Sequence, residues 1–224
     1  MIPNILAERY STPPMKAIWS PQGKVKLERE LWVAVMKGQR DLGLDISSGA
    51  IADYEKVIEK IDLESIDARE RITRHDVKAR IEEFCDLAGH EEIHKGMTSR
   101  DLTENVEQLQ VARSLEVLQV KVGAVLKRMA AHADSSKDLV ITARTHNVAA
   151  QITTMGKRFS MFGEELLVSL NSLNNLIETY PVRGLKGAVG TQLDQLSLFE
   201  GDSGKALELE SKVTEHLGLS LIHI

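Results

Sequence analysis

Cysteine, long apolar runs and an excess of basic charge are all scarce in this sequence, and each absence excludes a class of protein. Cys85 is the only cysteine among 224 residues, so an internal disulfide framework is excluded and a reducing compartment is favoured. No stretch of about 18 consecutive apolar residues offers a transmembrane helix. The N-terminus also lacks the charged start and apolar stretch of a signal peptide. We therefore expect a cytoplasmic protein.

Charge is mixed rather than concentrated. Charged residues make up 27% of the chain and the formal net charge is -5, which is ordinary for a soluble protein. Because neither a basic excess nor a long run of one sign is present, a nucleic-acid partner is not expected. Small anionic molecules remain compatible with this composition, since a few Arg and Lys residues can gather locally in an acidic protein.

Proline and glycine mark the organisation of the N-terminal half. Four of the five prolines lie in residues 1–23, which predicts an irregular lead-in segment. Apolar residues then recur at helical spacing from Leu27 to Leu42, and Gly43 offers a stop. Two more helices are predicted over residues 48–61 and 75–87. Residues 89–96, bounded by glycines, are predicted to form a loop.

Two long segments carry apolar residues at alternating steps of three and four. We call them the first seam (Leu102, Val106, Leu109, Val111, Leu115, Leu118, Val122, Val125 and Met129) and the second seam (Ile152, Met155, Phe159, Phe162, Leu166, Leu170, Leu173 and Ile177). This spacing is typical of helix bundles and coiled coils. Each helix would be about 25 to 35 residues long, or roughly 40 to 50 Å.

Helices of that length need neighbours that this chain is too short to supply, so a bundle shared between subunits is expected. No convincing strand or hairpin pattern interrupts them, apart from ambiguous stretches such as residues 139–142. The predicted fold class is all-α. An N-terminal helical domain would span residues 1–97, and part of a central long-helix bundle would span residues 98–224.

Polar residues that could carry chemistry stand where the helices begin. Thr98 opens the first seam helix and Asp101 follows three residues later, the pattern of a capping box. The same helix N-terminus, with its free N–H groups, the hydroxyls of Thr98 and Ser99 and the charge of Arg100, is also suited to bind a carboxylate or a phosphate. Both interpretations can hold together.

Two histidines occupy similar positions. His146, within Arg144-Thr145-His146-Asn147, directly precedes the second seam and could donate or accept a proton near neutral pH. His75, within Arg74-His75-Asp76, precedes another helix. In each case a capping or surface role is the alternative, and Asp76 could simply be a first-turn acid favoured by the helix dipole.

A third histidine pattern matches a metal motif. His90-Glu91-Glu92-Ile93-His94 has the H-E-x-x-H spacing of zinc metalloproteases, which requires one face of a continuous helix. Gly89 and Gly96 leave barely one helical turn, and no third-ligand pattern follows, so zinc hydrolysis is disfavoured. Residues 184–191 are glycine-rich but lack P-loop spacing, and a flexible connection between helices is expected there.

Taken in order, these motifs resemble the fumarase/aspartase superfamily and, within it, the adenylosuccinate lyase family. The matching stretches cover most of the chain: Arg9-Tyr10, Arg74-His75-Asp76, residues 94–101, Arg144-Thr145-His146, residues 153–157 and residues 186–191. The Arg-Tyr start and the Arg-His-Asp triplet favour this family over argininosuccinate lyase or fumarase. Asn147 departs from the glycine that many members have at that position.

The resemblance implies a carbon–nitrogen lyase of purine biosynthesis that forms a homotetramer and needs no metal or cofactor. Its members cleave adenylosuccinate to AMP and fumarate, and the succinylcarboxamide ribotide SAICAR to AICAR and fumarate, by β-elimination. Carried over by motif, His146 would be the general acid, and His75 would orient the substrate's phosphate or assist the acid. The substrate-binding residues would be Thr98, Ser99 and Thr145 for the succinyl carboxylates, Arg9 and Tyr10 for the phosphate end, and Arg74 and Asp76 beside His75. No role is implied for His94.

One element of the family's active site has no counterpart in the sequence. The family's base is a serine on a mobile Gly-Ser-Ser-x-Met-Pro loop, and the chain reaches Ile224 without one. We therefore expect a truncated, N-terminal part of such a lyase that is inactive alone. The alternatives are another lyase of the superfamily, such as argininosuccinate lyase, and a non-catalytic helical scaffold.

Overall fold

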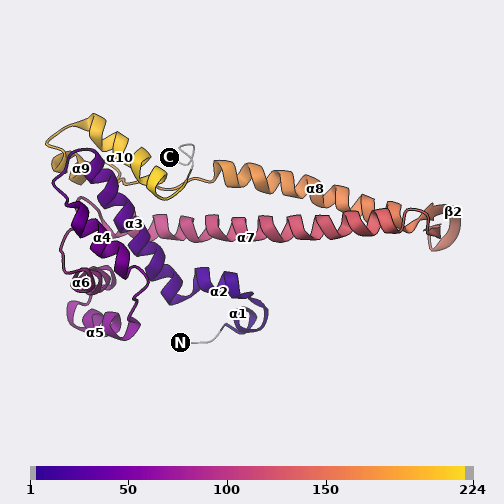
Figure 1. Ribbon diagram of the computed structural model, residues 1–224, viewed down its shortest axis with the longest axis horizontal. Helices are drawn as coiled ribbons and strands as arrows, with labels where there is room; N and C mark the ends of the chain where they lie inside the picture. Colours follow the sequence, from indigo (N-terminus) through magenta and orange to yellow (C-terminus); the bar gives the residue numbers. More distant parts are fainter. Residues whose placement is uncertain (1–3, 220–224) are drawn as a thin grey trace. The chain divides into compact units, whose positions relative to one another are not determined.

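The computed structural model describes residues 4–219 of the chain (Figure 1). These residues form ten helices and one two-stranded antiparallel sheet. The helices are α1 (Ile5–Tyr10), α2 (Pro13–Trp19), α3 (Pro21–Asp41), α4 (Ser48–Val57), α5 (Leu63–Thr73), α6 (Asp76–Ala88), α7 (Ser99–Ser135), α8 (Met155–Thr179), α9 (Leu193–Leu198) and α10 (Ser203–His216), and the strands are β1 (Val140–Thr145) and β2 (Val148–Thr154). The predicted all-α class is confirmed, with one hairpin added.

The described chain divides into two compact units. Unit 1 takes in the residues up to Arg113 and those from Thr179 onward, and unit 2 is Ser114–Glu178. The long helix α7 contributes its first part to unit 1 and its remainder to unit 2. The domain boundary expected near residue 97 stays a prediction. Among the helices of residues 4–219, none has the length and apolar character needed to cross a membrane.

Unit 1 is organised around α3, whose apolar side buries Leu31, Trp32 and Val35 almost completely. Helix α10 packs along α3 so closely that a Cβ added to Gly38 would lie 3.0 Å from Leu209 Cδ1. Helices α4 and α5 both pack on α6. The first turns of α7 bring further apolar side chains of the first seam into this core (Leu102, Val106 and Leu109).

Unit 2 is a helical hairpin in which α7 and α8 run side by side in opposite directions and the β1–β2 hairpin joins them (Figure 1). Gly156 permits the close approach at the joined end, because a Cβ there would lie 2.4 Å from the Ala133 carbonyl oxygen. Gln119 Nε2 donates to Asn174 Oδ1 at 2.8 Å near the other end. Of the residues in α8, only Gly156 is fully buried.

The structure corrects the lead-in and adds a helix. Residues 5–10 and 13–19 form α1 and α2 rather than irregular chain. Asn4 caps α1 through its side chain, and Pro13 occupies the first turn of α2, where a proline ring is tolerated. Helix α5, which was not predicted, begins after Asp62, whose carboxylate accepts from Ser65 N at 3.0 Å. Its charged, weakly apolar sequence gave little periodic signal.

The prediction that no hairpin interrupts the seams is wrong. β1 and β2 pair from Val140↔Thr154 to Thr145↔Val148, and β-branched residues dominate both strands, as strand propensity favours. Ile152, assigned to the second seam helix, is a residue of β2 and is 80% exposed. The helix that carries the rest of the second seam begins at Met155.

Candidate functional site

One of the two hydrogen bonds of the predicted capping box is present at the N-terminus of α7. Asp101 accepts a hydrogen bond from the backbone N–H of Thr98 at 3.0 Å, which is the reach-back half of a capping box. Within residues 4–219, the hydroxyls of Thr98 and Ser99 make no hydrogen bond, and both residues are half-buried. They remain available to a ligand beside the N–H groups of the first turn of α7.

Asp101 also joins this helix end to the glycine-rich segment 184–191. Its carboxylate is fully buried, and Oδ1 accepts from the backbone N–H groups of Lys186 at 2.9 Å and Gly187 at 3.1 Å. The guanidinium of Arg183 pairs with the same oxygen and lies 2.6 Å from Glu104 Oε2. Since a buried carboxylate is costly without partners, these donors fix where the segment lies.

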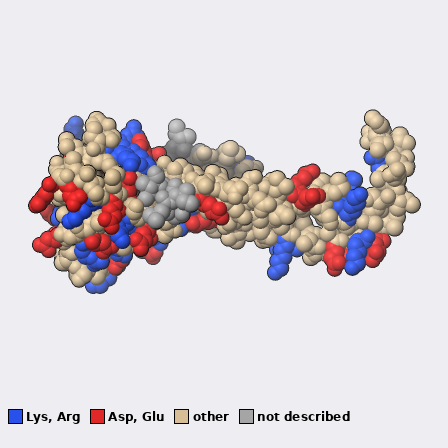
Figure 2. Space-filling view, turned by 90° about the horizontal axis from the view of Figure 1, so that it is seen from above, with Lys and Arg blue, Asp and Glu red and all other residues tan. Residues whose placement is uncertain are grey.

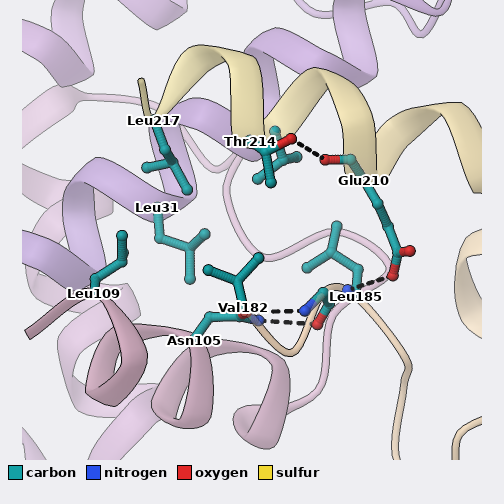
Figure 3. Close-up of a pocket in the computed structure, with 10 residues that line it drawn as sticks. Leu31, Asn105, Leu109, Val182, Leu185, Glu210, Thr214 and Leu217 are labelled. Atoms are coloured by element: carbon teal, nitrogen blue, oxygen red, sulfur yellow. Dashed lines mark hydrogen bonds between the residues drawn. The ribbon is translucent and has the colours of Figure 1, made fainter. Parts of the chain in front are cut away.

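The glycine-rich segment is held on its other side by α10. Glu210 Oε1 accepts from Leu185 N at 2.9 Å, and Lys186 Nζ lies 2.7 Å from the same carboxylate. Asn105 exchanges two hydrogen bonds with the backbone of Gly184, at 2.9 and 3.0 Å (Figure 3). The segment is thus a connection between helices, as expected, and it is anchored to both α7 and α10.

Figure 3 shows a cavity under this segment, lined mostly by apolar side chains of α3, α7 and α10. Its volume is about 20 Å³, which is room for little more than one water molecule. It cannot hold a metabolite, so the hydrogen-bonding groups around it serve packing rather than binding.

His75 lies at the junction of α5 and α6 with the rest of its triplet. Arg74 closes α5 in the left-handed conformation with φ 52°, and His75 caps α6, its Nδ1 accepting from Lys78 N at 3.2 Å. Asp76 begins α6 and lies 3.7 Å from His75 Nδ1. All three side chains are exposed, as a substrate-binding role requires.

A buried acid lies behind this triplet. Arg80 bridges Asp76, at 2.8 Å, and Glu28 on α3, at 2.7 Å. Glu28 is fully buried, and among the described residues its oxygens have no correctly oriented hydrogen-bond donor, Arg80 Nε included. Burial therefore raises the pKa of Glu28 to about 7, although the charge of Arg80 opposes the shift.

His94 lies close to the same group of residues and is held by Trp32. The Trp32 indole Nε1–H donates to His94 Nδ1 at 3.0 Å. Burial lowers the pKa of His94, while the charge of Asp101 raises it and that of His75 lowers it again. His75 and Asp101, both in unit 1, are therefore near enough to His94 for their charges to influence its pKa.

The H-E-x-x-H pattern does not form a zinc-binding face. Residues 90–94 lie in the predicted loop rather than on a helix. His90 pairs with Asp53 at 3.0 Å, whereas His94 pairs with Trp32. Within residues 4–219 no group of His, Cys, Asp and Glu side chains has an arrangement that could hold a metal ion.

His146 and Thr145 lie in unit 2, at the tip of the β hairpin. Thr145 ends β1, and His146 and Asn147 form the two-residue turn with φ values of 48° and 62°. Positive φ at both positions is the requirement of the common hairpin turn. Arg144 Nη1 donates to the Asn147 carbonyl at 3.0 Å across the turn. His146 is therefore an exposed turn residue rather than the cap of a helix.

Arg9 and Tyr10 end α1 in unit 1, and both are exposed. Motif reasoning missed the residues that hold the site in place, namely Trp32, Asn105, Arg183 and Glu210. Their side chains act through long-range contacts. Trp32 and His94 are 62 residues apart in the sequence, and Arg183 and Asp101 are 82 residues apart. No local pattern could have found them.

Comparison with known proteins assigns this arrangement to a family. The sequence matches the lyase family over residues 9–215. The chain belongs to the lyase family. Its relatives include an adenylosuccinate lyase of Schistosoma mansoni, 36% identical over 96% of this chain and 45% of the relative, and one of Saccharomyces cerevisiae, 33% identical over 97% and 46%. The chain thus spans about half the length of the curated relatives it matches.

Solved structures share the fold of this lyase-family chain. A fumarate lyase from Mesorhizobium sp. BNC1 superposes with a TM-score of 0.76 at 21% identity, covering 94% of this chain and 49% of that one. The 3-carboxy-cis,cis-muconate lactonizing enzyme of Pseudomonas putida gives a TM-score of 0.77 at 19% identity, with 97% and 50% covered. The resemblance that the sequence motifs indicated is confirmed.

Proposed function

We propose that the protein is a carbon–nitrogen lyase of the adenylosuccinate lyase type, acting in purine biosynthesis in the cytoplasm. Its reactions would be the cleavage of adenylosuccinate to AMP and fumarate and of SAICAR to AICAR and fumarate. The observation that carries the proposal is the identity with adenylosuccinate lyases, which continues through 96% of the chain. That alignment spans 219 residues at 36% identity.

The reaction requires a base, an acid and donors for a carboxylate. The base removes a proton from the succinyl carbon next to a carboxylate, the electron pair forms the C=C bond of fumarate, and the C–N bond breaks. The acid protonates the departing nitrogen. Negative charge that builds on the carboxylate must be stabilised by donors fixed in advance.

Unit 1 supports the donor role. The hydroxyls of Thr98 and Ser99 and the N–H groups at the start of α7 would hold a succinyl carboxylate. The exposed His75, with Arg74 and Asp76 beside it, would bind the phosphate or assist the acid. Arg9 and Tyr10, on α1, would bind the phosphate end of the nucleotide.

Unit 2 would supply the acid and the means of assembly. His146, at the exposed tip of the hairpin, would protonate the leaving nitrogen, and Thr145 would bind a carboxylate. Large apolar side chains of α8 such as Phe162 and Val168 are 56% and 63% exposed. Burial of such side chains against other copies would support a homotetramer whose active sites combine several subunits.

The test is fumarate release from adenylosuccinate by the longest protein that the reading frame encodes. We expect activity there, none from the 224-residue chain, and a loss of about 100-fold or more in His146→Ala, since general acid catalysis is worth roughly that much. His132→Ala, which removes another histidine of unit 2, is the matched control and should keep its activity.

Three outcomes would overturn the proposal or a part of it. Unchanged turnover in His146→Ala, with the oligomeric state also unchanged, would remove the acid assignment. Cleavage of argininosuccinate in place of adenylosuccinate would move the protein to a different member of the superfamily. An inactive longest form would favour the helical scaffold.

A further inference from the structure

The loop that carries His94 is fixed in place by three hydrogen bonds to consecutive carbonyls. Met97 N donates to the His94 carbonyl at 3.2 Å, Gln39 Nε2 to that of Lys95 at 2.9 Å, and Gln195 Nε2 to that of Gly96 at 2.6 Å. His94 adopts φ 67° in this turn, a conformation that costs free energy for a residue with a side chain. The turn is thus held in place by side chains of α3 and α9 as well as by its own backbone.

The side chain of His94 is fixed as well, by a group that is itself immobile. Trp32 is fully buried on α3, and its ring stacks on Phe84 with centroids 6.1 Å apart. The guanidinium of Arg29 lies over the same Phe84 ring, with its central carbon 4.6 Å from the ring centroid. The indole Nε1–H therefore points at His94 Nδ1 from a rigid support, at the 3.0 Å of a good hydrogen bond.

We propose that Trp32 is a positioning residue that holds His94 as a neutral imidazole with its proton on Nε2, so that His94 presents an N–H to an oxygen of a bound anion. An indole N–H can only donate, so Nδ1 must accept and carries no proton. The proton of the neutral ring is then on Nε2. Within residues 4–219, Nε2 makes no hydrogen bond, and the side chain is half-buried rather than enclosed.

The surroundings of His94 agree with a neutral donor. Burial lowers its pKa, and so does the charge of His75, while Asp101 alone acts in the opposite direction. Asp101 is already engaged with Thr98, Arg183 and the 186–187 backbone. His94 can therefore donate a hydrogen bond to a carboxylate or phosphate oxygen, but it cannot take up a proton at Nδ1 while the Trp32 bond lasts.

The donor role toward a substrate rests on the proposed function, whereas the tautomer does not, and the experiment tests the tautomer. The 224-residue chain, labelled with ¹⁵N, has only two indole N–H groups, those of Trp19 and Trp32. We expect a scalar coupling across the hydrogen bond between Trp32 Nε1 and His94 Nδ1. The Trp32 indole resonance should also shift as His94 titrates, while the Trp19 resonance stays unchanged.

Substitutions distinguish the effect of the Trp32–His94 hydrogen bond from that of general packing. Trp32→Phe keeps an aromatic ring but removes the donor, so the coupling should vanish and the pKa of His94 should rise by about 0.5 to 1 unit, the equivalent of one ordinary hydrogen bond. Trp19→Phe is the matched control and should leave His94 unchanged. His94→Gln, on the loop, should move the Trp32 resonance even if the Trp32 variant fails to fold.

A pyrrole-type Nδ1 in the unaltered chain would overturn the proposal, because a protonated Nδ1 cannot accept from Trp32. Absence of the coupling together with a Trp32 resonance that ignores the His94 titration would do the same. Neither result depends on turnover, so failure of the proposed His94 tautomer and failure of the lyase assignment can be told apart.

Discussion

The two units use the same apolar periodicity and obtain different degrees of burial from it. In unit 1, the first seam residues Leu102, Val106 and Leu109 are at most 1% exposed, whereas Leu118 and Val125, further along the same helix, are 43% and 47% exposed. The spacing determines which face of α7 is apolar, but burial depends on which elements lie against that face. Unit 1 supplies them from α3 and α10, and unit 2 supplies only α8.

Polar groups follow the same division. Asp101 in unit 1 is fully buried and accepts hydrogen bonds from three separate backbone N–H groups in addition to its ion pair. Asp134, on the same helix in unit 2, pairs only with Lys137 and its side chain is 81% exposed. Figure 2 shows charged side chains crowded over unit 1 and sparse over much of the visible face of unit 2. Buried polar contacts such as those of Asp101 therefore help to hold unit 1 together. The ion pair of Asp134 is exposed and is not a contact of this kind.

The largest effect is expected from Asp101→Asn. The amide would turn an N–H₂ group toward at least one of the donors that the carboxylate now accepts, and Arg183 would lose a buried partner. Breaking a buried ion pair typically costs about 3 to 5 kcal/mol, so we expect the free energy of unfolding of unit 1 to fall by about 3 kcal/mol. Urea unfolding followed by tryptophan fluorescence reports on this unit, since both tryptophans belong to it.

Asp134→Asn is the matched control on the same helix. An exposed ion pair contributes little, and we expect the free energy of unfolding to change by less than about 0.5 kcal/mol, measured by circular dichroism. Equal costs for the two substitutions would show that burial does not distinguish the two parts of α7.

The sequence predicted what depends on neighbours along the chain. Both long helices, the loop at residues 89–96, the Thr98 start of α7 and the family motifs were all found, because spacing, glycine and capping patterns are local. The hairpin was missed although residues 140–145 are rich in β-branched side chains, since the turn residues are His146-Asn147 rather than the Asn-Gly that marks such turns. Helix α5 was missed because its sequence is rich in charged residues and has few apolar residues at helical spacing.

The supports of the candidate site could not be predicted in the same way. Trp32 carries a typical core pattern on α3, and only the fold places its N–H against His94. Glu28 likewise looks like an ordinary solvent-facing acid within α3, yet it is fully buried beside Arg80. Such pairings depend on the packing of α3 against α6 and the 94–97 loop, which no single-sequence pattern specifies.

The next largest effect is expected from a change of pH. Glu28 should dominate the pH dependence of the free energy of unfolding of unit 1. Because burial raises its pKa from 4.5 to about 7, the folded state binds more protons than the unfolded state between these values. The free energy of unfolding then falls as pH rises from about 4.5 to about 7. At about 1.4 kcal/mol per pKa unit, the rise of about 2.5 units sets an upper limit of about 3.5 kcal/mol on this loss.

Glu28→Gln removes this titration and should gain stability over the unaltered chain through the same pH window. Urea unfolding of both chains at a series of pH values measures the difference, in which other titrating groups cancel. A difference that is flat with pH, or that favours the unaltered chain as pH rises, would mean that Arg80 holds Glu28 ionised.

The smallest effect is expected at the exposed hairpin turn of unit 2. Asn147 adopts φ 62° at the second turn position, where glycine has no steric cost. Asn147→Gly should stabilise the hairpin by about 0.5 to 1 kcal/mol and slow amide hydrogen exchange in β1 and β2 roughly two- to fivefold. Asn147→Val, a β-branched residue at positive φ, should accelerate exchange instead. Exchange in unit 1 should not change in either variant, and a change there would show that the two units are energetically coupled.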